Sequence, residues 1–289
     1  MGLQIKEIIA VAEKILRENG VEDYKADAEI LLCHEIRYDS RKIFMNWSKE
    51  LDDEACERYF ADVQRRAAGT PTQYLTEMQP FMGFNFSVDE RVLIPRMDTE
   101  TVVESAIEFI RSQKSIKNVL DLCTGSGVIA ISLAKAVPSL KLTATDISGD
   151  ALAVAAKNAS RLGVSARIKF LRSDLFNSLP TGFTAKKFDM IIANPPYIRT
   201  AVLPRLQREI YEHEPLIALD GGEDGLDYYR AIATRAPSFL TKRGVIFFEI
   251  GYDQAEDVSD ILRDTGNFAG ISVRRDIAGN DRVVFASVK

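Results

Sequence analysis

The stretch that decides the fold is residues 118–137, which read NVLDLCTGSGVIAISLAKAV. The residues Val119-Leu120-Asp121-Leu122, three of which are apolar, predict a short strand, and a turn with two glycines follows it. An apolar helix is then expected over residues 128–137, with Pro138 as its stop. A strand, a glycine-rich turn and a helix in that order are typical of the first unit of a parallel sheet that binds a nucleotide-like ligand.

Strands and helices continue to alternate along the chain after this stretch. The apolar spacing predicts strands at 141–145, 168–171, 190–193 and 245–250, and helices at 151–162, 228–240 and 254–263. Two short closing strands, 271–274 and 282–287, are expected to form a hairpin. This alternation predicts the α/β class, with an open and mostly parallel sheet that carries helices on both faces.

The first third of the chain has a different pattern, because its apolar residues recur at helical spacing. Helices are expected over about 3–20, 26–36, 40–44 and 53–68, where Asp39 or Ser40 caps the third and Asp52 or Asp53 caps the fourth. These helices predict a small helical bundle.

A change of apolar period marks the join between the two halves. Alternation over 84–88, a polar break and the apolar run 92–94 predict a β-hairpin. Pro95 ends this run, and Asp98 or Thr99 is expected to start a helix. We therefore expect a helical domain at 1–75, a β-hairpin linker at 76–97 and an α/β domain at 98–289.

Composition limits the class of protein. The chain has 289 residues, of which 46% are hydrophobic and 27% charged, and no apolar run approaches the ~20 residues of a membrane helix. Three dispersed cysteines (Cys33, Cys56 and Cys123) give neither zinc spacing nor a disulfide framework, so we expect no metal site. The N-terminus lacks a signal-peptide pattern. We expect a cytoplasmic protein without membrane contact.

The acidic charge lies in the first third of the chain. Residues 1–98 carry 13 basic and 19 acidic side chains, a net charge of −6, whereas residues 99–289 carry 24 and 23. Because nucleic-acid affinity depends largely on Lys and Arg, we expect no direct binding of nucleic acid. The same acidity could also be a solvated surface that aids solubility.

The glycine-rich turn is a candidate cofactor site, and carboxylates follow it at strand ends. Asp146 stands 19 residues after the second glycine, at the end of the next strand, where a carboxylate can accept hydrogen bonds from a ribose. Asp174, with Leu175 beside it, ends the third strand and could meet an adenine ring. Each feature has a structural alternative: a tight turn for the glycines, a helix cap for Asp174. The turn itself comprises Asp121, Cys123, Thr124, Gly125, Ser126 and Gly127.

The same turn also fits a dinucleotide, since Gly125, Gly127 and Ala130 satisfy the dehydrogenase spacing. However, Asp121 would repel a pyrophosphate, whereas a carboxylate suits a cation. S-adenosylmethionine carries a sulfonium and an ammonium group and no phosphate, so the turn favours that cofactor. Calorimetric titration with both ligands would separate an NAD(P)-dependent oxidoreductase from a methyltransferase.

The clearest chemical signal is Asn194-Pro195-Pro196-Tyr197, directly after the apolar strand 190–193. Two prolines fix φ and remove two donors, which leaves a rigid rim with the Asn194 side-chain oxygen and the Pro195 carbonyl as acceptors. Two acceptors can orient a planar –NH2 group and stabilise the positive charge that develops as it is methylated. Tyr197 offers a flat face to the same group. A proline-rich loop capped by Asn194 is the structural alternative.

With the glycine-rich turn, this motif resembles the class I S-adenosylmethionine-dependent methyltransferases, and most closely the HemK/PrmC family of release factor glutamine methyltransferases. The flanking stretches carry the family assignment, because adenine methyltransferases also have Asn-Pro-Pro-Tyr. The stretches that resemble this family are GTPTQYL at 69–75, LIPRMDTE at 93–100, Glu214-Pro215, LDGGEDGL at 219–226 and FEIG at 248–251. The family usually has proline at Met97 and often glycine at Cys123.

The resemblance implies a helical domain that helps to recognise the protein substrate, a hairpin linker and a Rossmann-like seven-stranded methyltransferase domain. It implies N5-methylation of the glutamine in the Gly-Gly-Gln motif of peptide chain release factors, by a chain that we expect to be a monomer. Residues 123–127, Asp146, Asp174 and Leu175 would bind S-adenosylmethionine, with Asp121 and Asn194 beside it, and Asn194 to Tyr197 would hold the target glutamine. Glu249 is expected to support structure.

Two alternatives use the same residues. The first is an N6-adenine methyltransferase acting on DNA or RNA, which would show methyl transfer to nucleic acid and salt-sensitive binding. The second is a catalytically silent binding protein, disfavoured because the groups that the chemistry requires are present.

Overall fold

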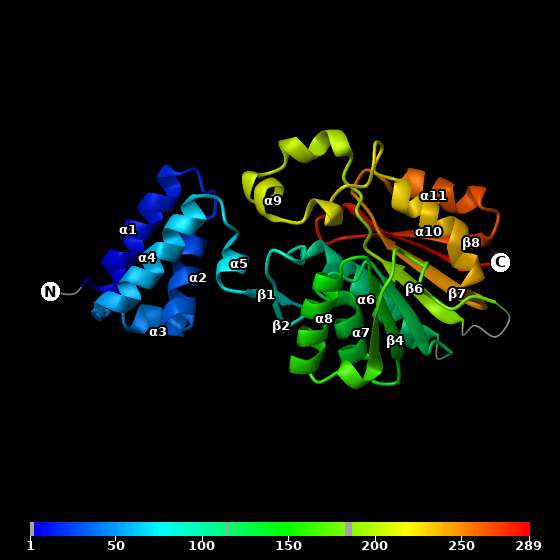
Figure 1. Ribbon diagram of the computed structural model, residues 1–289, viewed down its shortest axis with the longest axis horizontal. Coiled ribbons are helices and arrows are strands. Elements are labelled where there is room, and N and C mark those ends of the chain that lie inside the picture. The colour runs from blue at the N-terminus through cyan, green and yellow to red at the C-terminus, as the bar shows by residue number, and fades with distance from the viewer. Residues whose placement is uncertain (1–2, 114, 183–186) are drawn as a thin grey trace. The chain divides into compact units, whose positions relative to one another are not determined.

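The structure is a computed structural model that describes residues 3–113, 115–182 and 187–289, and its chain forms two compact units (Figure 1). The helical unit consists of Met1–Met78 together with Leu206–His213. The α/β unit consists of Gln79–Arg205 together with Glu214–Lys289. The short segment 206–213 thus belongs to the helical unit although it comes late in the sequence.

The helical unit is built from α1 (Ile5–Glu18), α2 (Tyr24–Ile36), α3 (Ser40–Met45), α4 (Asp53–Ala67), α5 (Thr72–Leu75) and α9 (Arg208–His213). The bundle and two of its caps agree with the expectation: Asp39 accepts from Lys42 N, and Asp52 accepts from Ala55 N, each at 2.8 Å. Buried Arg66 pairs with Asp27 at 2.7 Å and with Glu209 at 2.6 Å, and so joins α4 to α2 and α9.

The hairpin lies earlier in the chain than expected. It consists of β1 (Met78–Phe81) and β2 (Phe84–Ser87), and the segment 92–94 forms no strand, so the expected second strand is wrong. The turn has Met82 at φ 50° and Gly83 at φ 75°, the positive values that a tight two-residue hairpin turn requires. Methionine is unusual at such a position, and this concealed the turn. Val92 and Ile94 are nevertheless buried, which explains their apolar pattern.

In the described residues, seven strands form one sheet, in the order β5-β4-β3-β6-β7-β9-β8. The parallel strands are β3 (Asn118–Leu122), β4 (Lys141–Asp146), β5 (Ile168–Arg172), β6 (Phe188–Ala193) and β7 (Leu240–Glu249). The antiparallel hairpin of β8 (Phe268–Arg275) and β9 (Asp281–Val288) closes one edge beside β7. The chain reverses direction across the sheet at β3, which lies between β4 and β6, and ligands of such sheets bind at this point.

Helices cover both faces of this sheet, as expected (Figure 1). Successive strand residues alternate between two apolar clusters: Met190 and Ile192 belong to one, Ile191 and Ala193 to the other. The first cluster packs under α6 (Asp98–Ser112), α7 (Val128–Ala136) and α8 (Gly149–Arg161), and the second under α10 (Asp227–Arg235) and α11 (Ala255–Asp264). The remaining turns are 3₁₀ helices at Ser165–Arg167, Thr200–Arg205, Leu216–Ala218 and Ala236–Ser238.

One predicted helix is too long. The expected helix 228–240 ends at Arg235, because Pro237 cannot continue it and the chain turns into a 3₁₀ helix. Strand β7 then begins at Leu240, five residues before the expected start. Within the described residues, no helix combines the length and the apolar character needed to cross a membrane.

Candidate active site

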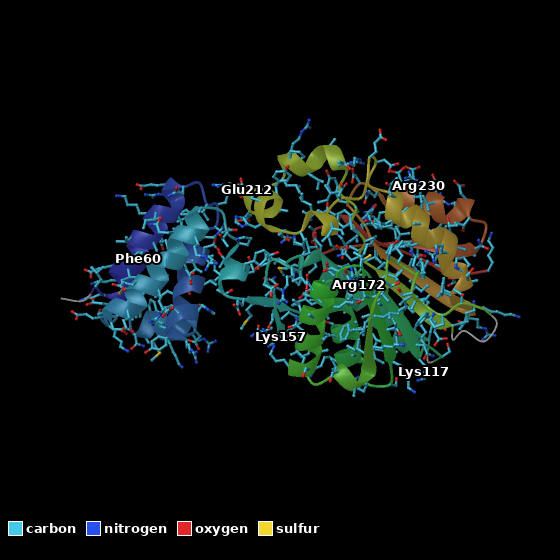
Figure 2. All side chains as sticks on the ribbon, in the orientation of Figure 1. Phe60, Lys117, Lys157, Arg172, Glu212 and Arg230 are labelled. Atoms are coloured by element: carbon cyan, nitrogen blue, oxygen red, sulfur yellow. The ribbon has the colours of Figure 1, made fainter. Side chains whose placement is uncertain are left out.

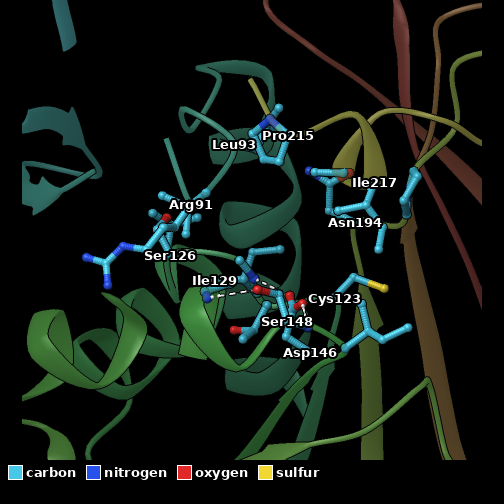
Figure 3. A pocket seen from close by; sticks show the side chains of 18 of the residues that line it. Arg91, Leu93, Cys123, Ser126, Ile129, Asp146, Ser148, Asn194, Pro215 and Ile217 are labelled. Atoms are coloured by element: carbon cyan, nitrogen blue, oxygen red, sulfur yellow. Dashed lines mark hydrogen bonds between the residues drawn. The ribbon is translucent and has the colours of Figure 1, made fainter. Parts of the chain in front are cut away.

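A pocket of about 980 Å³, including its open mouth, lies at the carboxyl ends of the parallel strands (Figure 3). Its walls come from the turns after β3, β4, β5 and β6 and from two loops of the α/β unit. Nine of the residues that the sequence predicts for the site line it: Cys123, Thr124, Gly125, Ser126, Asp146, Asp174, Leu175, Asn194 and Pro196. The other four do not line it: Asp121, Gly127 and Pro195 are buried, and Tyr197 is half-buried.

The two glycines of the turn have different roles. Both have positive φ, 54° for Gly125 and 86° for Gly127. A Cβ atom on Gly125 would meet open space, whereas one on Gly127 would lie 2.9 Å from Ile131 Cδ1 and 3.1 Å from Ala155 Cβ. Gly125 therefore gives the pocket its backbone shape, and Gly127 allows α7 and α8 to pack closely.

Asp121 lies fully buried at the end of β3, directly beneath the turn. Its Oδ2 accepts from the Thr124 hydroxyl at 2.6 Å and from Ala130 N at 3.2 Å, while its Oδ1 has no hydrogen-bond partner. Burial raises the pKa of Asp121 to about 7, and the nearby charge of Asp146 adds to this shift. A buried carboxylate oxygen without a partner is costly, and a cationic ligand would compensate for it.

Asp146, at the end of β4, faces the pocket with a fixed carboxylate. Its Oδ2 accepts from Gly125 N and its Oδ1 from Ser148 N, both at 2.9 Å, and these bonds are drawn in Figure 3. Burial raises the pKa of this carboxyl as well. The next residue, Ile147, lines the pocket while 45% exposed, and the sequence analysis missed it. An apolar residue directly after a strand-end acid was the available signal.

Asp174 and Leu175 form a further wall after β5. The Asp174 carboxylate is exposed and accepts from Asn177 Nδ2 at 2.9 Å, and Leu175 takes a positive φ of 45°. Asp174 therefore lines the pocket, and the alternative role as a helix cap is wrong, because the segment after it is a turn and its carboxylate binds a side-chain amide.

Cys123 lines the pocket with its thiol. Its backbone has a φ of 58°, in the left-handed region that favours glycine. Burial is the main cause that raises the pKa of this thiol, and Asp146, Asp121 and Asp174 raise it further. The group is therefore a neutral thiol at physiological pH and a poor nucleophile. Met97, the other departure from the family pattern, is 77% exposed.

Asn194 extends from the end of β6 to the pocket, and its Nδ2 lies 3.4 Å from Thr99 Oγ1 on α6. Pro196 lines the pocket beside it, and Pro195 is buried. Tyr197 packs against the apolar cluster under α10 and α11, so its ring is part of the support of the Asn-Pro-Pro-Tyr segment.

A second loop, Leu219–Leu226, holds this segment from behind. A Cβ on Gly221 would lie 2.7 Å from Tyr197 Cα and 2.9 Å from the Pro196 oxygen, so only glycine allows this approach. Gln254 Nε2 donates to the carbonyl oxygens of Tyr197 at 3.1 Å and Gly225 at 3.2 Å, which joins the two loops. No physical role for this loop was evident from its residues alone, and the structure supplies one.

Ion pairs at the protein surface also hold the loop Leu219–Leu226 in place. Arg230 lies on the surface of α10 (Figure 2) and donates to Asp224 at 3.0 Å and to Asp227 at 3.2 Å. Binding to Arg230 lowers the pKa of Asp224.

The opposite wall contains residues that the sequence analysis did not assign to the site. Glu214, whose side chain is 1% exposed, accepts from Arg96 Nη2 at 2.5 Å and from Ile94 N at 3.1 Å. These bonds connect the extended segment 93–96 to Pro215, and Leu93, Pro95, Arg96 and Pro215 all line the pocket. Both segments belong to the stretches that carry the family resemblance. However, Arg96 and Glu214 are 118 positions apart in the sequence, so no local pattern predicts their contact.

The sheet order and the pocket at its switch point define a class I methyltransferase. Residues 7–76 match the family described as PrmC N-terminal domain, and residues 103–214 match the Methyltransferase small domain. The chain belongs to the release factor glutamine methyltransferase family. It is 39% identical to the release factor glutamine methyltransferase of Clostridium acetobutylicum and 40% identical to that of Moorella thermoacetica, each over 98% of both chains.

The solved structures agree on the fold. A methyltransferase from Pyrococcus furiosus is 15% identical and has a TM-score of 0.50, covering 79% of this chain and 98% of its own. This likeness concerns the arrangement of elements alone.

Proposed function

We propose that this protein transfers a methyl group from S-adenosylmethionine to the side-chain nitrogen of the glutamine in the Gly-Gly-Gln motif of peptide chain release factors. The observation that carries the proposal is the position of Asn194, which lines the pocket at the end of β6 with its Nδ2 side toward Thr99. Relatives with that name match nearly the whole chain.

The described residues suit S-adenosylmethionine. Two carboxylates, Asp146 and Asp174, line the pocket, and a third, Asp121, lies beneath it with an oxygen that has no partner. The two arginines of the lining, Arg91 and Arg96, are already paired with Asp89 and Glu214. The carboxylates therefore remain for a ligand with a sulfonium and an ammonium group, and they oppose a pyrophosphate. The apolar side chains of Ile147 and Leu175 provide surface for an adenine. Bound there, S-adenosylmethionine supplies an electrophilic methyl group.

Two groups of the ledge, defined here as Asn194–Tyr197, would act on the acceptor. The lone pair of a carboxamide nitrogen is delocalised, so the nitrogen is a poor nucleophile. Acceptors at the Asn194 side chain and the Pro195 carbonyl would bind its two hydrogens and stabilise positive charge as the nitrogen–carbon bond forms and the carbon–sulfur bond breaks. The proton becomes acidic only after transfer, so no strong general base is required.

We assign recognition of the protein substrate to the helical domain, residues 1–75, with 76–97 as the linker and 98–289 as the methyltransferase domain. The acidic charge of residues 1–98 suits a basic face on the partner. On and after α3, Phe44, Met45 and Trp47 are 77%, 81% and 42% exposed, which adds apolar surface for contact.

The test is incubation of the protein with methyl-labelled S-adenosylmethionine and a purified release factor, followed by mass spectrometric mapping of the label. We expect the label on the glutamine of Gly-Gly-Gln and none when that glutamine is replaced by alanine. A parallel incubation with DNA and RNA tests adenine methylation. Label on nucleic acid, or on another residue of the release factor, would refute the proposal.

A further inference from the structure

The end of β7 brings a carboxylate beside the catalytic asparagine. Strands β6 and β7 are parallel neighbours with Ala193 opposite Phe248, so the next residues, Asn194 and Glu249, lie next to each other. Glu249 is 1% exposed, and its Oε2 has no hydrogen-bond partner. The proposed mechanism does not use this group, and the sequence analysis assigned it to structure.

The surroundings of Glu249 connect it to the ledge. Hydrogen bonding from the side chains of Thr99 and Asn194 lowers the pKa of Glu249 and so opposes the larger effect of burial, which raises it. Thr99 lies 3.4 Å from Asn194 Nδ2, so the three side chains form one contiguous group. Charged neighbours are Arg282 and Asp98, which pair with each other at 3.0 Å.

We propose that Glu249 is a positioning residue that turns the Asn194 amide so that its oxygen faces the target nitrogen. An asparagine amide has a donor end and an acceptor end that are nearly equal in shape, so its orientation depends on its partners. An ionised carboxylate can only accept. Glu249 therefore holds the –NH2 end of Asn194, and the oxygen is left toward the pocket.

The charge of Glu249 adds a second effect. A carboxylate that accepts from the Asn194 –NH2 polarises the amide and makes its oxygen a stronger acceptor. That oxygen would face the nitrogen on which positive charge develops during transfer, so the benefit is larger in the transition state than in the ground state. The inference rests on the proposed function and predicts an effect on kcat rather than on cofactor affinity.

Stability distinguishes positioning from a purely structural role. Burial is the largest cause that raises the pKa of Glu249 to about 7, so the folded protein holds the charged form at a cost above that pH. Replacement of Glu249 by an uncharged isostere should then leave the melting temperature at pH 8 unchanged or higher. A structural residue would instead lower it.

The test compares Glu249→Gln with Asp276→Asn, a control that removes a carboxylate from the other side of Arg282 at 3.3 Å. With a release factor as substrate and saturating cofactor, we expect kcat to fall about tenfold in Glu249→Gln. We expect cofactor affinity to be unchanged and the control to retain full activity. Thr99→Val should lower kcat in the same way, and Thr99→Ser, which keeps the hydroxyl, should restore it.

The interaction between Glu249 and Asn194 can also be tested by NMR, without enzymatic turnover. In protein labelled with ¹⁵N-asparagine, the side-chain –NH2 signals of Asn194 are assigned by their loss in Asn194→Asp. We expect these signals to shift in Glu249→Gln and to stay in place in Asp276→Asn. Unchanged signals, or full kcat in Glu249→Gln, would overturn the proposal while leaving the methylation itself intact. Absence of methylation by the unmodified protein would overturn the proposed function, and the shift would still report on Glu249 and Asn194.

Discussion

A single methyl group at Gly221 tests how rigidly the ledge must be held. Built on Gly221, a Cβ atom would lie 2.7 Å from Tyr197 Cα, 2.8 Å from its carbonyl carbon and 2.9 Å from the Pro196 oxygen. These are backbone atoms, so no side-chain rotation relieves the contact. Restoring a separation of about 3.4 Å requires a shift of about 0.7 Å between the loop and the ledge, and a misplacement of about 1 Å can cost about 100-fold in rate.

We therefore expect Gly221→Ala to lower kcat by about 10- to 100-fold, which corresponds to about 1.4–2.7 kcal/mol in the barrier. Cofactor affinity should stay within about twofold, because the residues that we propose bind the cofactor come from the turns after β3, β4 and β5. The assay is transfer of labelled methyl to a release factor, with calorimetric titration of S-adenosylmethionine.

The matched control is Gly149→Ala at the start of α8. A Cβ there would meet only Arg172 Cδ, at an ordinary 3.8 Å, so both kcat and the melting temperature should be preserved. Full kcat in Gly221→Ala would show that the position of the ledge is not rate-determining, and the reasoning would be refuted.

Three further perturbations address the remaining groups. Asn194→Ala should abolish methyl transfer while calorimetry shows cofactor binding intact; a joint loss of both would mean that Asn194 serves the cofactor. A cationic cofactor favours the charged form of Asp121, whose pKa burial raises to about 7, so the affinity measured by calorimetry should rise from pH 5.5 to 7.5 and rise less steeply in Asp121→Asn. By the same linkage, the charged Asp121 destabilises the cofactor-free protein above pH 7, so Asp121→Asn should melt higher than the unmodified protein at pH 8, and this difference should shrink as pH falls toward 4; equal melting temperatures at pH 8 would contradict this. Cys123 should react with iodoacetamide at pH 8 far more slowly than a free thiol, by peptide mapping, because burial raises its pKa.

Local patterns in the sequence predicted most of the fold. The strands predicted at 119–122 and 190–193 and the helix predicted at 128–137 each depend on neighbouring residues, and each was confirmed to within two residues. The hairpin failed because Met82 occupies a position with positive φ where asparagine or glycine is usual. The helix from Asp227 was predicted too long because the effect of Pro237 was outweighed by the apolar pattern beyond it.

The parts of the site that escaped prediction are those formed by contacts between distant segments. Arg96 and Glu214 are 118 residues apart, and Gly221 approaches Tyr197 only after the sheet has formed. In the sequence, Glu249 is an acidic residue at the end of an apolar strand. This pattern does not reveal which side chain its carboxylate faces. Register supplies that information: the pairing of β6 with β7 sets Glu249 beside Asn194.

The ledge alone does not distinguish a carboxamide from an adenine, since both present a planar –NH2 group. The rest of the pocket differs for the two. Among the described residues that line it, the one aromatic side chain is Tyr228, whose phenol lies near Cys123 and Asp174 at the cofactor end. Tyr197 packs into the core, so it offers no ring for a base to stack on. The lining residues from 92–95 and 215–218 are aliphatic or proline, including Leu93 and Pro215, and these favour a slender glutamine side chain over a base that needs a stacking partner.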